Sequence, residues 1–370
     1  MPAGIASLKP AEFQVVAKMT AAAVPPAAQL APAPTTTTAV ARIGPATQFV
    51  ARSGATLTLG GAPYRFTGLN IYNANSRDNC WYSLGNADGR LDAALGSIGA
   101  GQEVFRAWFF QSLATTNGVR DWSAFDHTLA VAKARGVRVI ATLANQWGDC
   151  EEQPAGVYKT DSWYASGYRT IVRSGTVDYR SWVAEIAARY GNDPTVMAWE
   201  LMNEPENKVD ATGPCGAAKT LRRWAADVSS LIKAVDPNHL VAVGTIGSGQ
   251  CGAQEDAYRA LHALPAIDLC SYHDYDLPQA AMPGDQWNGL QVRLDQCAAI
   301  GKPLFVGETG LSSSGTGALA ARATAFDRKF AAEFAAGAVG ILMWSWRDEG
   351  SNTGYDIGPL DPALALLAAY

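Results

Sequence analysis

The sequence Trp122-Ser-Ala-Phe-Asp-His-Thr-Leu-Ala-Val-Ala-Lys-Ala-Arg135, followed by Gly136 and Val137-Arg-Val-Ile-Ala-Thr-Leu143, shows how the chain is built. The first part has a helical pattern, and a glycine after a basic residue is a common helix stop. The short apolar run that follows is typical of a buried strand. A helix followed by a buried strand is therefore predicted here, and the same alternation recurs along the chain.

Working outward, we predict a hairpin over Leu57–Phe66, with Gly60-Gly61 as its turn, that continues into Gly68-Leu-Asn70. The further predicted strands are Glu103–Trp108, Val137–Leu143, Val196–Leu201, Leu240–Gly244, Ile267–Tyr272, Pro303–Gly307 and Gly340–Trp344. The predicted helices are Trp122–Arg135, Tyr179–Tyr190, Ala217–Val235, Leu290–Ile300 and Ala318–Ala336. About eight strands, each followed by a helix or a long loop, indicate an α/β protein with a (β/α)₈ TIM barrel. A doubly wound sheet has the same alternation and remains the structural alternative.

Composition limits the class of partner. The 370 residues carry 29 Lys and Arg against 34 Asp and Glu, a net charge of −5, so neither a nucleic acid nor an anionic membrane is expected as a partner. No apolar run is long enough to span a bilayer. Residues 1–47 are rich in Ala, Pro and Thr and are predicted to form a flexible tail, with a single catalytic domain over residues 48–370. We expect a monomer.

The six cysteines lie far apart, with no C-x-x-C pair and no Cys/His spacing of a zinc site. They fit disulfides in a secreted protein or, as the alternative, scattered reduced thiols. No clear signal peptide is visible, because Lys9, Glu12 and Lys18 interrupt any apolar segment near the N-terminus. Secretion is therefore expected from the cysteines and the tail alone.

Polar and aromatic residues gather where the predicted strands end, which is where TIM-barrel enzymes place their chemistry. Two of them are the glutamates of Asn203-Glu204-Pro205 and Gly307-Glu308-Thr309. Two carboxyl groups across a cleft can cleave a glycosidic bond, one protonating the leaving oxygen and the other attacking the sugar. The remaining candidate site residues at these strand ends are Arg106, Trp108, Asn145, Trp147, Asn203, His273, Tyr275 and Trp344.

Four segments of the chain resemble glycoside hydrolase family 5, and the resemblance extends from Phe49 to Trp346. The segments are Phe105-Arg-Ala-Trp108, Trp199-Glu-Leu-Met-Asn-Glu-Pro205, Tyr272-His-Asp-Tyr275 and Phe305-Val-Gly-Glu-Thr-Gly310. The resemblance implies that Glu204 is the acid/base and Glu308 the nucleophile of a retaining mechanism. It also implies supporting roles: Arg106 and Tyr275 keep the nucleophile ionised, Asn203 binds the sugar 2-hydroxyl, His273 supports the acid/base and Trp344 forms the floor of the cleft.

Within that family, Tyr64-Arg-Phe-Thr-Gly-Leu-Asn-Ile-Tyr72 and Leu143-Ala-Asn-Gln-Trp147 are similar to segments of endo-β-1,4-mannanases. This similarity implies a β-linked polysaccharide or oligosaccharide of the mannan type as substrate. Glu206 departs from the pattern, because mannanases of the eukaryotic type usually carry Arg after Asn-Glu-Pro. A β-glucanase, an exo-acting β-glycosidase and a non-catalytic carbohydrate-binding protein remain alternatives.

No cofactor and no metal are expected, because this mechanism needs neither and none of the four histidines is paired at helical metal-ligand spacing. Gly247-Ser-Gly-Gln-Cys-Gly252 matches the dinucleotide-binding pattern G-x-G-x-x-G. A nucleotide site would leave both glutamates unexplained, and the match lies in mid-chain, so this reading is disfavoured.

Overall fold

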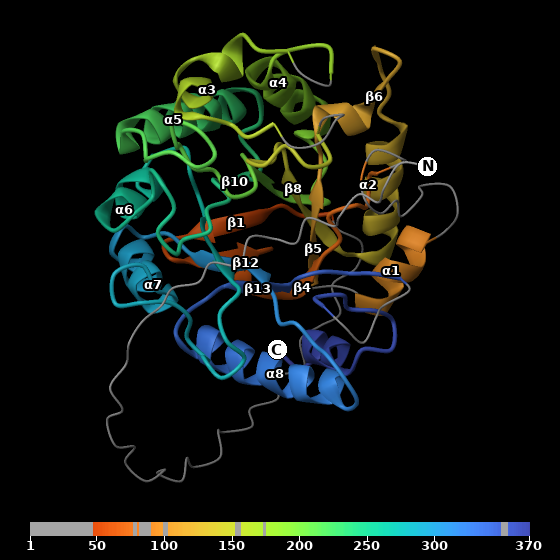
Figure 1. Ribbon diagram of the computed structural model, residues 1–370. Coiled ribbons are helices and arrows are strands. Elements are labelled where there is room, and N and C mark those ends of the chain that lie inside the picture. The colour runs from red at the N-terminus through yellow and green to blue at the C-terminus, as the bar shows by residue number, and fades with distance from the viewer. Residues whose placement is uncertain are drawn as a thin grey trace, which may run out of the picture. The chain divides into compact units, whose positions relative to one another are not determined.

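The computed structural model describes residues 47–76, 80, 90–98, 103–151, 157–172, 175–348 and 354–370. Eight parallel strands lie side by side in the order β10-β9-β8-β5-β4-β13-β12-β11. A parallel bridge from Ala242 to Leu269 joins the two ends of this order and nearly closes the barrel (Figure 1). The strands are β4 (Phe66–Asn70), β5 (Val104–Trp108), β8 (Arg138–Thr142), β9 (Val196–Glu200), β10 (Leu240–Ala242), β11 (Cys270–Asp274), β12 (Leu304–Thr309) and β13 (Gly340–Met343). The predicted (β/α)₈ barrel is confirmed, and the doubly wound sheet is wrong.

Helices surround the strands (Figure 1), and such a helix typically buries one apolar stripe. In α5, for example, Leu221, Trp224, Val228 and Ile232 recur every three or four residues and are all fully buried. The helices are α1 (Arg90–Ile98), α2 (Ser123–Arg135), α3 (Asp161–Ala165), α4 (Tyr179–Tyr190), α5 (Ala218–Val235), α6 (Asp256–His262), α7 (Leu290–Ala299) and α8 (Ala318–Ala335), with 3₁₀ helices η1 (Gln111–Ala114), η2 (Gly167–Arg169) and η3 (Pro362–Ala368).

The predicted hairpin belongs to a small antiparallel sheet of β1 (Val50–Ser53), β2 (Thr56–Leu59) and β3 (Ala62–Tyr64). Its buried side chains share one apolar cluster with residues inside the barrel, among them Phe66, Ile140 and Met197. Phe66, Val104 and Leu240 belong to this cluster and stand at the starts of their strands, so this sheet covers the N-terminal end of the barrel. A two-stranded hairpin of β6 (Thr115–Thr116) and β7 (Val119–Arg120) follows η1. With one end of the barrel filled, the opposite, C-terminal end is left for a site.

All six cysteines form disulfides, Cys80–Cys150, Cys215–Cys251 and Cys270–Cys297, so the expectation of disulfides is confirmed. Among the helices that the structure describes, none is long and apolar enough to cross a membrane. The predicted tail of residues 1–47 falls, except for residue 47, outside the described ranges.

Candidate active site

The site is built around Arg106, which β5 carries into the barrel with no solvent exposure. Its Nε donates to Glu200 Oε1 at 2.7 Å and its Nη2 to Asn203 Oδ1 at 2.8 Å. Its Nη1 donates to Glu308 Oε1 at 2.7 Å and to Asn70 Oδ1 at 3.0 Å. One guanidinium therefore fixes four side chains that come from three strand ends, those of β4, β9 and β12.

Glu308 lies near the end of β12, where its side chain is 4 % exposed. While Oε1 accepts from Arg106, Oε2 accepts from the Tyr275 hydroxyl at 2.5 Å. Burial raises the pKa of Tyr275 well above its ordinary value, so the phenol keeps the proton that it donates. Both oxygens of Glu308 are thus held in one orientation.

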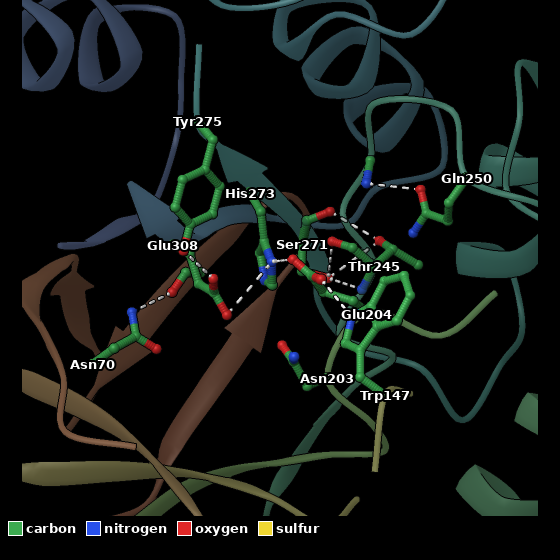
Figure 2. A network of polar contacts seen from close by, with 12 residues as sticks. Asn70, Trp147, Asn203, Glu204, Thr245, Gln250, Ser271, His273, Tyr275 and Glu308 are labelled. Atoms are coloured by element: carbon green, nitrogen blue, oxygen red, sulfur yellow. Dashed lines mark hydrogen bonds and ion pairs between the residues drawn. The ribbon is translucent and has the colours of Figure 1, made fainter. Parts of the chain in front are cut away.

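Glu204 follows β9 in a left-handed backbone conformation, with φ of 53°. Such a conformation is costly for a residue with a side chain and needs support from its surroundings. Its N–H donates to Gly244 O at 2.8 Å, which fixes the loop against the residues that follow β10. The Glu204 carboxylate accepts from Trp147 Nε1 at 3.1 Å and contacts His273 Nδ1 at 2.8 Å (Figure 2).

The two glutamates and His273 form one compact group. His273 Nδ1 lies 2.8 Å from Glu204 Oε1 and 3.6 Å from Glu308 Oε1. One carboxylate oxygen of each glutamate and one ring nitrogen of His273 all lie within 4.8 Å of one another. Three ligand atoms at these distances could also hold a metal ion. The Arg106 guanidinium disfavours a cation at this position, because it already donates to the same Glu308 oxygen.

Burial and neighbouring charges act on these groups in opposite directions. Burial raises the pKa of Glu308 above its ordinary value and outweighs the lowering by His273 and Arg106. Burial also favours a neutral Glu204, but the hydrogen bond and charge of His273 outweigh it, so the pKa of Glu204 is lowered. For His273 itself burial lowers the pKa, whereas Glu308 and Glu204 raise it above its ordinary value on balance. These directions favour a proton on His273 rather than on Glu204, and Arg106 alone does not set the pKa of Glu308.

The aromatic candidates differ in their exposure. Trp344 is partly exposed and stacks on Tyr72 with ring centroids 5.2 Å apart. A cis peptide bond joins Trp344 to Ser345. Trp108 is only 3 % exposed, and its ring centroid lies 6.2 Å from that of Trp344 and 4.8 Å from the Arg106 guanidinium carbon. Trp344 can thus contact a ligand, whereas Trp108 mainly supports Trp344 and Arg106.

The two asparagine candidates lie one behind the other. Asn203 Nδ2 donates to Asn145 Oδ1 at 3.1 Å, and Asn145 is 4 % exposed. An amide group has two N–H donors, so one N–H of Asn203 remains for a ligand while Asn145 holds the amide in place.

Asn70 and Glu200 are two members of this network that the sequence analysis did not identify. Asn70 ends β4 and donates from Nδ2 to Gly307 O at 2.9 Å, next to Glu308. Glu200 ends β9, where Thr142 also donates to its Oε1 at 2.9 Å. A polar residue at the end of an otherwise apolar strand, as in Gly68-Leu-Asn70 and Ala198-Trp-Glu200, is the signal that could have indicated both.

Comparison with known families agrees with this geometry. The family model described as "Cellulase (glycosyl hydrolase family 5)" matches residues 67–350, most of the chain. The chain belongs to glycosyl hydrolase family 5. The resemblance noted in the sequence is therefore confirmed, and the protein is a glycoside hydrolase by family.

Curated relatives of this family 5 protein carry names of mannan-cleaving enzymes. The chain is 27% identical to a probable mannan endo-1,4-beta-mannosidase F of Emericella nidulans over 82% of its length and 72% of the relative's. It is 28% identical to a putative mannan endo-1,4-beta-mannosidase 9 of Oryza sativa subsp. japonica, over 84% and 85%. An endo-1,4-beta-mannanase structure from Rhizomucor miehei has the same fold, with a TM-score of 0.66 at 21% identity over 86% of this chain and 96% of the other.

Proposed function

We propose that this family 5 protein is a retaining enzyme that cleaves β-1,4 linkages of a mannan-type polysaccharide by double displacement. The observation that carries the proposal is the Glu204–His273–Glu308 group, whose members approach within 4.8 Å of one another. Retaining glycosidases hold their two carboxyl groups ~5–5.5 Å apart, whereas inverting enzymes leave ~6.5–9.5 Å for a water molecule. The spacing here favours retention.

In the first step, an oxygen of Glu308 would bond to the anomeric carbon as the bond to the leaving oxygen breaks. The leaving oxygen would take up a proton held by the hydrogen-bonded pair of Glu204 and His273. The contacts to Arg106 and Tyr275 support Glu308 as the nucleophile, because they stabilise its ionised form and aim it. Glu204 suits the acid, since its side chain is 17 % exposed and can reach a leaving group.

In the second step, Glu204 would remove a proton from water as the water attacks the anomeric carbon. The bond to Glu308 breaks and its carboxylate is restored, so two inversions give net retention. The hydrogen bond to His273 suits both steps, because the pair can release a proton and take one back at the same place.

The sugar itself would lie over Trp344, with the free N–H of Asn203 directed to its 2-hydroxyl. A mannan-type substrate is supported by the names of the relatives and by the mannanase-like segments at Tyr64–Tyr72 and Leu143–Trp147. The second candidate is a β-glucan, because the matching family model is described as a cellulase. We further propose that the enzyme acts outside the cell, since three disulfides persist in oxidising compartments. We also propose that it acts as a monomer.

The proposal is tested by reducing-sugar release from β-mannan, glucomannan and carboxymethyl cellulose. Glu308→Gln keeps the shape of the side chain but removes the nucleophile, and Glu185→Gln makes the same change at a partly exposed glutamate paired with Arg120. We expect cleavage of mannan by the wild type and Glu185→Gln, and none by Glu308→Gln. Cleavage of cellulose alone would overturn the mannan assignment, and full activity of Glu308→Gln would overturn the mechanism.

A further inference from the structure

Two partly exposed aromatic rings follow β8, and the first of them contacts Glu204. Trp147 donates to Glu204 Oε2 at 3.1 Å, and the Tyr158 ring lies 5.6 Å from the Trp147 ring at an angle of 59°. Each ring offers an apolar face, and we call this pair of tilted rings the Trp147–Tyr158 corner. Tyr158 was not among the residues that the sequence analysis selected.

Tyr158 is held by polar contacts of its hydroxyl group. A ring that only fills space in the protein would not need them. Its hydroxyl donates to Glu206 Oε1 at 2.8 Å, and Lys208 Nζ lies 3.1 Å from the same oxygen. Glu206 is 5 % exposed, and its backbone N–H donates to Gln146 Oε1 at 3.2 Å. Burial and the Glu206 charge raise the pKa of Tyr158, so the hydroxyl stays a donor to Glu206 and can accept from a ligand.

The loop that carries Glu206 and Lys208 is itself held in place by buried contacts. Asn207 is fully buried and donates from Nδ2 to Asp161 Oδ1 at 2.7 Å and to Ala217 O at 2.9 Å. The Cys215–Cys251 disulfide ties the end of this loop to the segment after β10. The Trp147–Tyr158 corner is therefore preorganised, which lowers the entropy lost when a ligand binds.

The position of the corner indicates which part of the substrate it would meet. A general acid must lie within hydrogen-bond reach of the leaving oxygen, so the leaving sugar lies next to Glu204. Figure 2 shows Glu308 and Tyr275 on one side of Glu204 and Trp147 on the other. A sugar beyond the cleaved bond would thus meet Trp147 first and Tyr158 next.

We propose that Tyr158 binds the leaving-group sugar, with its ring against the apolar face of a β-linked hexose and its oxygen accepting a sugar hydroxyl. Glu206 and Lys208 are positioning residues that act through Tyr158. The proposal rests on the proposed glycosidase function and adds the side of the bond on which this chain selects its substrate. The same corner would bind a second sugar that replaces water as the acceptor in the second step.

The test compares two substrates of the same sugar, mannohexaose and para-nitrophenyl β-mannobioside. The aryl compound carries no sugar on the leaving-group side. For Tyr158→Ala we expect kcat/KM on mannohexaose to fall about tenfold, equivalent to ~1.4 kcal/mol. On the aryl compound kcat/KM should stay within about twofold, because the chemistry at Glu204 and Glu308 is intact. Transfer to added mannotriose should fall relative to hydrolysis.

Tyr158→Phe and Glu206→Gln keep the ring and separate its packing from its hydroxyl. Both should show a smaller loss in the same direction, on mannohexaose only, and they carry the test if Tyr158→Ala does not fold. Equal losses on both substrates, or no loss on either, would overturn the proposal. If the wild type cleaves cellohexaose and no mannan oligomer, the mannan assignment fails, and cellohexaose with para-nitrophenyl β-cellobioside tests Tyr158 in the same way.

Discussion

At the scale of the residue, Arg106 organises the site because its guanidinium donates to Glu200, Asn203, Glu308 and Asn70 at once. Lysine keeps the charge but has a compact ammonium group that cannot serve four acceptors in a fixed plane. We expect Arg106→Lys to lower kcat by about 10²–10³-fold, the usual loss when one charge-stabilising donor is removed. Steady-state kinetics measure this loss. Arg135→Lys, at an exposed pair with Asp92, is the control and should be unchanged; an active Arg106→Lys would contradict the account.

The pH dependence of kcat/KM belongs to the same residues. Glu308 must be ionised to attack, and its pKa is raised, so activity should be lost as pH falls through a value above its ordinary 4.5. The pair of Glu204 and His273 must hold a proton, and the pKa of His273 is raised, so activity should also be lost as pH rises through a value above 6.5. The Tyr275 hydroxyl lowers the pKa of Glu308, so Tyr275→Phe should move only the acid limb, to higher pH. A profile with no acid limb, or one that Tyr275→Phe leaves in place, would contradict these assignments.

Most residues of this contact network could be selected from their positions at the predicted strand ends. Glu204, Glu308, Arg106, Asn203, His273 and Tyr275 lie in one contact network, as their positions at strand ends indicated. The sequence could not tell which candidates face the cleft and which lie behind. Asn145 and Trp108 occupy the layer behind, and Asn70 and Glu200 were missed, because their importance depends on the reach of Arg106 across the barrel.

At the scale of the element, the barrel depends on close approach of β4 and β5 at Gly68. A Cβ atom at Gly68 would lie 1.6 Å from the carbonyl oxygen of Val104 in the neighbouring strand. Gly68→Ala must therefore separate the strands, and we expect a loss of about 1–3 kcal/mol in the free energy of unfolding. Denaturant unfolding measures it. Gly54→Ala has open space around its Cβ and should cost less despite its φ of 60°; equal stability of wild type and Gly68→Ala would refute this packing argument.

The elements themselves were largely predictable. The predicted helices Tyr179–Tyr190 and Ala318–Ala336 match α4 and α8 within one residue, because long amphipathic patterns with clear stops have few alternatives. The predicted strand Ile267–Tyr272 begins three residues before β11, since Ile267 and Leu269 are apolar and buried, but only Leu269 pairs, by a single bridge. Helices α3 and α6, of five and seven residues, were not predicted, because so short a segment shows barely two turns of any pattern.

At the scale of the whole molecule, three disulfides cross-link segments that are 70, 36 and 27 residues apart. A cross-link of this kind limits the freedom of the unfolded chain and stabilises the fold. We expect Cys270→Ser with Cys297→Ser to lower the free energy of unfolding by about 3 kcal/mol. Full reduction of the wild type should lower its melting temperature further. Identical melting curves with and without reductant would contradict the proposal that this protein works in an oxidising compartment.

In the proposed mechanism, Glu308 forms a covalent bond to the sugar. Incubation with a 2-deoxy-2-fluoro-β-mannosyl fluoride slows the second step, so that the intermediate accumulates and can be located by mass spectrometry of proteolytic peptides. We expect one fluorosugar per chain on the peptide that contains Glu308, and none in Glu308→Gln. An adduct on any other residue, or turnover of the reagent by a direct inversion that gives the α product, would contradict it.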